Sequence, residues 1–157
     1  MPGHWVACHQ VEGYDTAPTT RPNIQHKRTV TVDAYPGEAF AARQAAAYPD
    51  LVPLDVNRPA PEVFDLVIDA LKRLQMSIVA EQEPTDENPI GRAEAVDRTL
   101  ILGFYDDIAV RVTPVGDLSD PSARIDLRSS SRYGRSDFGA NAQRLRSIMR
   151  EIVARLE

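Results

Sequence analysis

The clearest hydrophobic pattern in the chain lies at its C-terminal end. Apolar side chains recur there at the spacing of one helical face, at Leu145, Ile148, Met149, Ile152, Val153 and Leu156. Steps of three and four residues predict an amphipathic helix whose apolar face packs on a core. The opposite face is expected to carry four basic side chains, Arg144, Arg146, Arg150 and Arg155.

A second helical pattern covers about residues 62–75. Its apolar positions share one face, at Val63, Val67, Leu71 and Leu74, with Phe64 and Ile68 beside them. Pro59 and Pro61 stand just before and inside the first turn, where proline is tolerated because the first N–H groups have no helical partner. The pattern predicts a helix with one buried face.

Between the two helical patterns, apolar and polar residues alternate and predict four strands. These strands lie within residues 76–83, 92–99, 108–112 and 124–128. Polar segments at 84–91 and 114–121 separate them and are rich in turn-forming residues. The order helix, four strands, helix predicts a single α+β domain over residues 46–157. We expect a four-stranded antiparallel sheet with helices on one face, a two-layer sandwich.

Residues 1–45 show no sustained periodicity. Residues 29–32 alternate like one short strand, and residues 37–47 have the pattern of a short helix that stops before Pro49. We predict an extended arm that becomes ordered where it lies on a protein partner. His4, Cys8 and His9 stand in this arm, but their spacing matches no common closed zinc site, so no metal site is predicted.

Composition is that of an ordinary globular protein. The 157 residues are 43% hydrophobic and 26% charged, which excludes a collagen, a wholly disordered chain and a disulfide scaffold. The net charge of -5 argues against a general nucleic-acid binder. Charge is unevenly distributed, because residues 124–157 carry eight Arg and four acidic side chains, and the remainder carries -9.

Targeting features are equally sparse. A single cysteine, Cys8, rules out a disulfide within the chain. The sequence has no apolar run of membrane-spanning length and no secretory signal, so a cytoplasmic location is the default expectation. Peripheral association with a membrane stays open.

The densest polar segment, residues 128–141, joins the fourth strand to the last helix. It contains three Arg, four Ser, one Asp and one Asn. One hypothesis is an anion site in which guanidinium, hydroxyl and helix N-terminal N–H groups converge on phosphate or carboxylate, built from Arg128, Ser130, Arg132, Arg135, Ser136 and Asn141. The alternative is a connection whose polar groups satisfy one another, with Asp137 or Asn141 capping the helix.

Two further features precede this segment. Asp106 and Asp107 are adjacent, so on a strand they point to opposite faces, and we interpret them as structural partners of Arg128 or Arg132. Asp137 is a third ion-pair candidate. The apolar run that follows the second strand is either buried or a contact for a protein partner or lipid, at Leu100, Ile101, Leu102 and Phe104.

Residues that drive common enzymes are missing from the predicted domain. No histidine follows His26 and no cysteine follows Cys8, so a Ser–His or Cys–His nucleophile pair cannot form within it. The sequence also lacks a nucleophile elbow, a Walker-type phosphate loop and a dinucleotide fingerprint. We assign no catalytic residues and expect no cofactor, and the balance leans away from an enzyme.

Four segments together resemble the family called domain of unknown function 1499 (DUF1499). They are residues 48–51 (YPDL), 91–95 (GRAEA), 103–112 (GFYDDIAVRV) and 126–141 (DLRSSSRYGRSDFGAN). The resemblance covers about residues 45–157 and implies no established activity. Some members of this family carry a hydrophobic segment before the soluble domain, and this chain shows none.

The sequence thus favours a non-enzymatic binding or accessory module that belongs to a membrane-associated assembly and reaches its partner through the arm. The alternative is a domain that binds a small anionic ligand, or an enzyme that acts on one, at residues 128–141. Nucleic-acid binding is a weaker third reading, since no row of aromatic residues accompanies the basic C-terminal segment.

Overall fold

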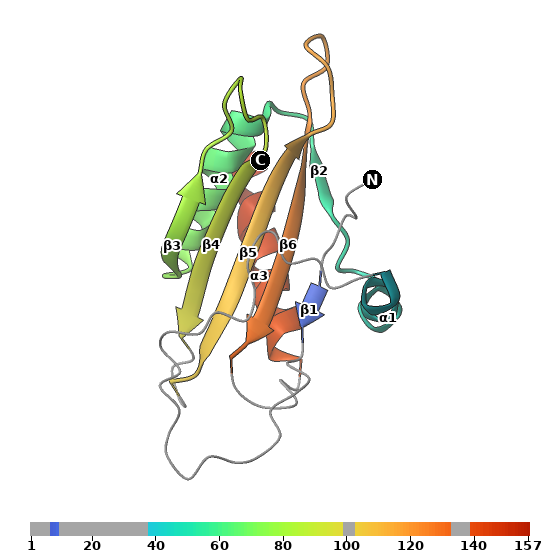
Figure 1. The fold of residues 1–157 in the computed structure, drawn as a ribbon, viewed down its shortest axis with the longest axis vertical. Coiled ribbons are helices and arrows are strands. Elements are labelled where there is room, and N and C mark those ends of the chain that lie inside the picture. The colour runs from blue at the N-terminus through green and yellow to red at the C-terminus, as the bar shows by residue number, and fades with distance from the viewer. Residues whose placement is uncertain (1–6, 10–37, 99–102, 133–138) are drawn as a thin grey trace.

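The computed structural model describes residues 7–9, 38–98, 103–132 and 139–157 (Figure 1). Six strands and three helices lie within these ranges. In chain order they are β1 (Ala7–His9), α1 (Glu38–Ala47), β2 (Leu54–Val56), α2 (Ala60–Arg73), β3 (Ser77–Gln82), β4 (Gly91–Arg98), β5 (Tyr105–Pro114), β6 (Ala123–Ser131) and α3 (Ala140–Leu156).

One open sheet organises the fold, with strand order β1-β6-β5-β4-β3 (Figure 1). The four longer strands, β3 to β6, are antiparallel neighbours in sequence order. Two short strands pair with β6 on the side away from β5: β2 antiparallel at residues 123–125, and β1 parallel at residues 128–130.

The predicted α+β class is confirmed, but the predicted count of four strands is wrong. The four predicted strands all form, and β1 and β2 join them. Each of these two strands has three residues, which is too short for an alternating pattern to stand out in the sequence. β6 also runs to Ser131, so the first residues of the 128–141 segment belong to a strand and not to a connection.

Helices α2 and α3 lie on the same face of the sheet and pack against each other (Figure 1). α2 contacts β3, β4 and β5, and α3 contacts β6. The apolar stripes predicted from the sequence form this layer, and the fully buried side chains include Val63, Val67, Leu71, Leu145, Ile148 and Ile152. Val153 was expected in the same stripe but is exposed, because it lies at the edge of the face that α3 turns to the sheet.

The N-terminal third is described only in part. The short helix expected near residues 37–47 is present as α1. Residues 7–9 form β1 and extend the sheet, so at least this piece of the predicted arm is paired within the chain. The predicted strand at residues 29–32 lies outside the described residues, and the arm as a whole stays a prediction. In the described part of the chain, no helix has the length and apolar character to cross a membrane.

Gly91 begins β4 where the sheet meets α2 at closest approach. A β-carbon at this position would lie 2.6 Å from Cδ2 of Phe64 and 3.1 Å from Cδ of Pro84. The ring of Phe64 is buried and cannot swing into solvent to make room. Glycine at this position therefore sets how tightly α2 can lie on the sheet.

We expect Gly91→Ala to lower the free energy of unfolding by about 1–3 kcal/mol, because overpacking forces neighbouring side chains out of preferred rotamers. Urea denaturation followed by circular dichroism measures it. Gln82→Ala, at an exposed position of β3, is the control and should stay close to the wild type. Equal stability of both variants would show that α2 is free to shift away.

Candidate functional site

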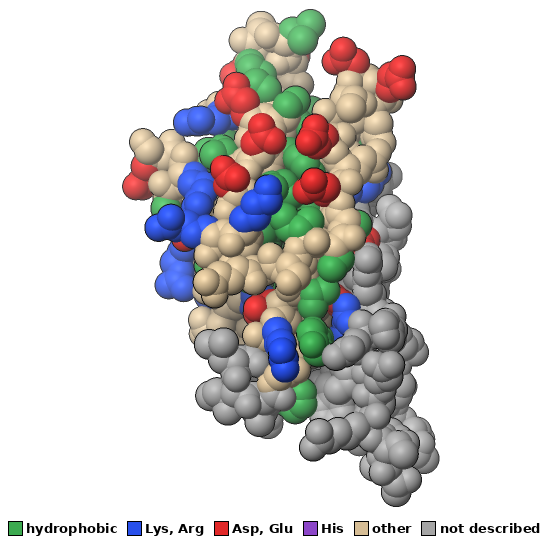
Figure 2. Space-filling view, turned by 90° about the vertical axis from the view of Figure 1, so that its left-hand side faces the viewer, with side chains coloured by type: hydrophobic (Ala, Val, Ile, Leu, Met, Phe, Trp, Pro, Cys, Tyr) green, Lys and Arg blue, Asp and Glu red, His purple; other side chains and the backbone are tan. Residues whose placement is uncertain are grey.

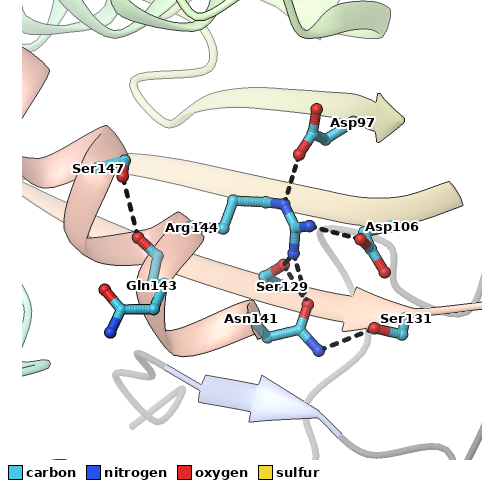
Figure 3. A network of polar contacts seen from close by, with 8 residues as sticks. All are labelled: Asp97, Asp106, Ser129, Ser131, Asn141, Gln143, Arg144 and Ser147. Atoms are coloured by element: carbon cyan, nitrogen blue, oxygen red, sulfur yellow. Dashed lines mark hydrogen bonds and ion pairs between the residues drawn. The ribbon is translucent and has the colours of Figure 1, made fainter. Parts of the chain in front are cut away.

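A buried polar network joins α3 to the sheet at the end where α3 begins (Figure 3). Its centre is Arg144, only 8% exposed. Nε of Arg144 donates to Asp97 Oδ2 at 2.8 Å, and Nη2 donates to Asp106 Oδ2. Nη1 donates to Ser129 Oγ at 3.2 Å and to Asn141 Oδ1 at 2.9 Å. One guanidinium thus contacts four side chains from three strands and its own helix.

Strand register brings these acceptors together. Asp97 of β4 lies opposite Asp106 of β5, and Asp106 lies opposite Ser131 of β6. Ser129 is two residues before Ser131, so both point to the face that α3 covers. Asn141 in the first turn of α3 completes the network, since it accepts from Ser129 Oγ at 2.7 Å and donates through Nδ2 to Ser131 Oγ at 3.2 Å.

Residues next in the chain to Asp106 and Ser131 form a second cluster, on the opposite face of the sheet. Arg132 donates through Nε and Nη2 to Asp107 Oδ1, at 2.9 and 2.6 Å. The side chains of this pair are 5% and 2% exposed. The guanidinium groups of Arg98 and Arg132 lie over the ring of Tyr105, 5.7 and 5.9 Å from its centroid, which is the distance of a cation–π contact.

The same face continues along β6 with charged side chains. Arg111 of β5 donates to Asp126 Oδ2 through Nε and Nη2, at 3.3 and 3.1 Å. Arg128 lies two residues further along β6, and its burial lowers the pKa of the guanidinium to about 10. Ser130 follows, and its buried Oγ has no hydrogen-bond partner among the residues that the structure describes. Neither α2 nor α3 lies on this face (Figure 1).

The structure divides the residues predicted as an anion site between two faces. Arg128 and Ser130 of β6, and Arg132 directly after it, lie on the face without α2 and α3, whereas Asn141 lies on the α3 side. Asp106 and Asp107 also lie on opposite faces of the sheet. Asp106 pairs with Arg144 on the α3 side, and Asp107 pairs with Arg132 on the other side. Arg135, Ser136 and Asp137 lie outside the described residues, as do Leu100, Ile101 and Leu102. Phe104 is half-buried.

Arg144 is the residue that sequence reasoning placed wrongly. Its expected position on the solvent face of the last helix is contradicted by its burial. A signal was present, because Arg144 stands three residues after Asn141 and four before Ile148, and so continues the buried stripe of α3 toward its N-terminus. The predicted stripe contains apolar residues alone and therefore begins at Leu145.

The buried carboxyl groups of this site take part in ion pairs. In the described part of the chain, the three buried aspartates each contact an arginine: Asp106 with Arg144, Asp107 with Arg132 and Asp126 with Arg111. No group of three His, Cys, Asp or Glu that could hold a metal ion occurs among the described residues.

Comparison with known proteins identifies a family that matches this chain. The family model described as "Protein of unknown function (DUF1499)" matches residues 16–152. The comparison with curated proteins gives no match. Among solved structures, one similar chain is the adenylate sensor from AMP-activated protein kinase, crystallised with the ribonucleotide ZMP. It is 12% identical, with a TM-score of 0.43, and the match covers 64% of this chain and 94% of that chain. A likeness at this TM-score has no bearing on ligand or function here.

We expect Asp106→Asn to lower the free energy of unfolding by about 3–5 kcal/mol, because it removes the more deeply buried of the two carboxylates that face the guanidinium of Arg144. Chemical denaturation measures the loss. Asp50→Asn is the matched control, since Asp50 forms a similar two-bond contact with Arg146 at 2.6 and 2.9 Å but is exposed. This variant should remain close to the wild type. A similar, small effect of both changes would mean that the network adds nothing to stability.

Proposed function

This chain belongs to the DUF1499 family, and on that premise we propose that it works as a non-enzymatic binding module, an accessory subunit of a membrane-associated assembly. The family description supplies no activity. One observation carries the proposal: the three buried aspartates of the described residues, Asp106, Asp107 and Asp126, each form an ion pair with an arginine. They hold the shape of the domain.

General acid–base catalysis needs a side chain that can exchange a proton with a substrate, and a buried carboxyl group is one candidate for that role. Asp106, Asp107 and Asp126 instead accept hydrogen bonds from guanidinium groups. Buried ion pairs of this kind hold elements in one relative position, and breaking one leaves an uncompensated charge. The arrangement supports a rigid scaffold that presents surfaces to a partner.

The membrane-associated part of the proposal rests on the sequence. It depends on the apolar run at residues 100–104 and on the arm at residues 1–45, which lie mostly outside the described residues. Both features are typical of segments that contact a partner or a lipid surface.

The full chain, tagged at its own locus and crosslinked in its native cells, should migrate as a complex larger than the monomer. We expect one protein partner at fixed stoichiometry in the membrane fraction, measured by quantitative mass spectrometry after gel filtration. An untagged strain is the control. A chain that stays monomeric in both the membrane and the soluble fraction would contradict the proposal.

A second candidate function, binding of a small oxyanion, has one observation in its favour. The buried hydroxyl of Ser130 has no hydrogen-bond partner among the described residues, and it lies two residues from Arg128 on the same face of β6. An oxyanion there would accept from Ser130 and offset the loss of solvation that lowers the pKa of Arg128.

If this site binds an oxyanion, inorganic phosphate should raise the melting temperature of the wild type above that in chloride of equal ionic strength. At a phosphate concentration ten times the dissociation constant, the free energy of unfolding should rise by about 1.4 kcal/mol. Ser130→Ala should lose most of the phosphate effect, whereas Ser77→Ala, at an exposed position of β3, should keep it. The candidate fails if Ser130→Ala responds to phosphate like the wild type.

A further inference from the structure

Residues 115–122 connect β5 to β6 and project beyond the end of the sheet (Figure 1). Leu118 lies in this hairpin with a relative exposure of 104%, so none of its surface is covered by the rest of the domain. The other exposed large hydrophobic residues that the structure describes reach at most 54%. Val115, in the same hairpin, is one of them at 46%.

Hydrogen bonds hold the hairpin in one tight conformation. Asp117 Oδ1 accepts from Ser119 Oγ at 2.6 Å and from the backbone N–H groups of Ser119 and Asp120 at 2.8 and 3.0 Å. These bonds keep the pKa of the Asp117 carboxyl below its usual value. Gly116 allows the close return of the chain, since a β-carbon there would lie 2.1 Å from the carbonyl oxygen of Asp120.

This rigidity matters because an ordered loop loses little conformational entropy when it binds. A flexible tip could fold Leu118 back onto the domain and hide it. The side-chain bonds of Asp117 instead keep the turn closed on both sides of Leu118, which stays pointed away from the core. The hairpin therefore presents an apolar side chain that is already in place for a complementary pocket.

Acidic side chains near the hairpin indicate that its partner has a basic surface. The loop between β3 and β4 projects from the same end of the sheet (Figure 1). Residues 83–90 and 115–122 together contain five acidic and no basic side chains, Glu83, Asp86, Glu87, Asp117 and Asp120. Figure 2 shows Asp and Glu side chains at the upper end of the visible face, with Lys and Arg side chains below and beside them. An acidic rim repels an anionic lipid surface and complements a basic one.

We propose that the hairpin is a docking knob, and that Leu118 inserts into an apolar socket ringed by Lys and Arg side chains on a partner protein. The inference rests on the proposed function as a binding module and names its contact surface and partner chemistry. Leu118 supplies the buried contact, and the acidic side chains supply orientation and speed of association.

The test begins with the full chain in its native cells, with a photocrosslinking amino acid at position 118 or, as control, at Val52, which is 54% exposed. A partner crosslinked from position 118 is then purified and its affinity for the full chain measured by calorimetry. We expect Leu118→Asp to bind about 10- to 100-fold more weakly, as loss of one buried leucine predicts. Val52→Asp should bind like the wild type.

Asp120→Lys tests the charge. It leaves the Asp117 turn intact, because Asp120 contributes only its backbone N–H. Its affinity should fall at low salt and approach the wild type at high salt.

The outcomes separate this inference from the proposed function. If the wild type forms no complex, both the binding-module proposal and the docking knob are wrong. If the complex forms and Leu118→Asp binds as the wild type does, the docking knob is wrong and the binding module survives. Crosslinks from position 118 to lipid alone, or to a second copy alone, also overturn the inference.

Discussion

The burial of one guanidinium, that of Arg144, is the constraint on which the arrangement of this domain depends. An arginine taken out of water is costly unless its donors are matched. Here Asp97, Asp106, Ser129 and Asn141 all accept from it. Because three of these lie on different strands, the match exists only when β4, β5 and β6 are in register and α3 starts at the correct position. The apolar layer between α2, α3 and the sheet supplies the gross burial, and the network specifies where α3 sits.

The two faces of the sheet use the same short stretch of sequence for different purposes. Alternation on β5 sends Asp106 to the α3 side and Asp107 to the other side, where Arg132 meets it. The described members of the polar motif therefore lie on two faces of the sheet, with Ser129 and Asn141 on the α3 side and Arg128, Ser130 and Arg132 on the other.

The domain also divides its tasks between its ends. The Arg144 network lies where β4 ends and β5 begins, and the projecting acidic hairpin lies at the opposite end of the sheet (Figure 1). Polar residues that are engaged internally stabilise shape, whereas an apolar residue left fully in water, such as Leu118, contributes nothing to the fold of the domain. The feature that stability does not account for is the natural place to expect a contact with another molecule.

The sequence by itself determined both long helices, the four longer strands, the α+β class and the family, because hydrophobic periodicity and contiguous motifs are local properties of the chain. It did not reveal β1 and β2, whose three residues each are defined by their pairing with β6. Nor did it reveal the partners of Arg144, since Asp97 lies 47 residues away in the chain and is brought near only by strand register. Leu118 reads as one apolar residue in a turn, and only the tertiary structure shows that nothing covers it. These decisions depend on which distant residues become neighbours, and a pattern along the chain does not contain that information.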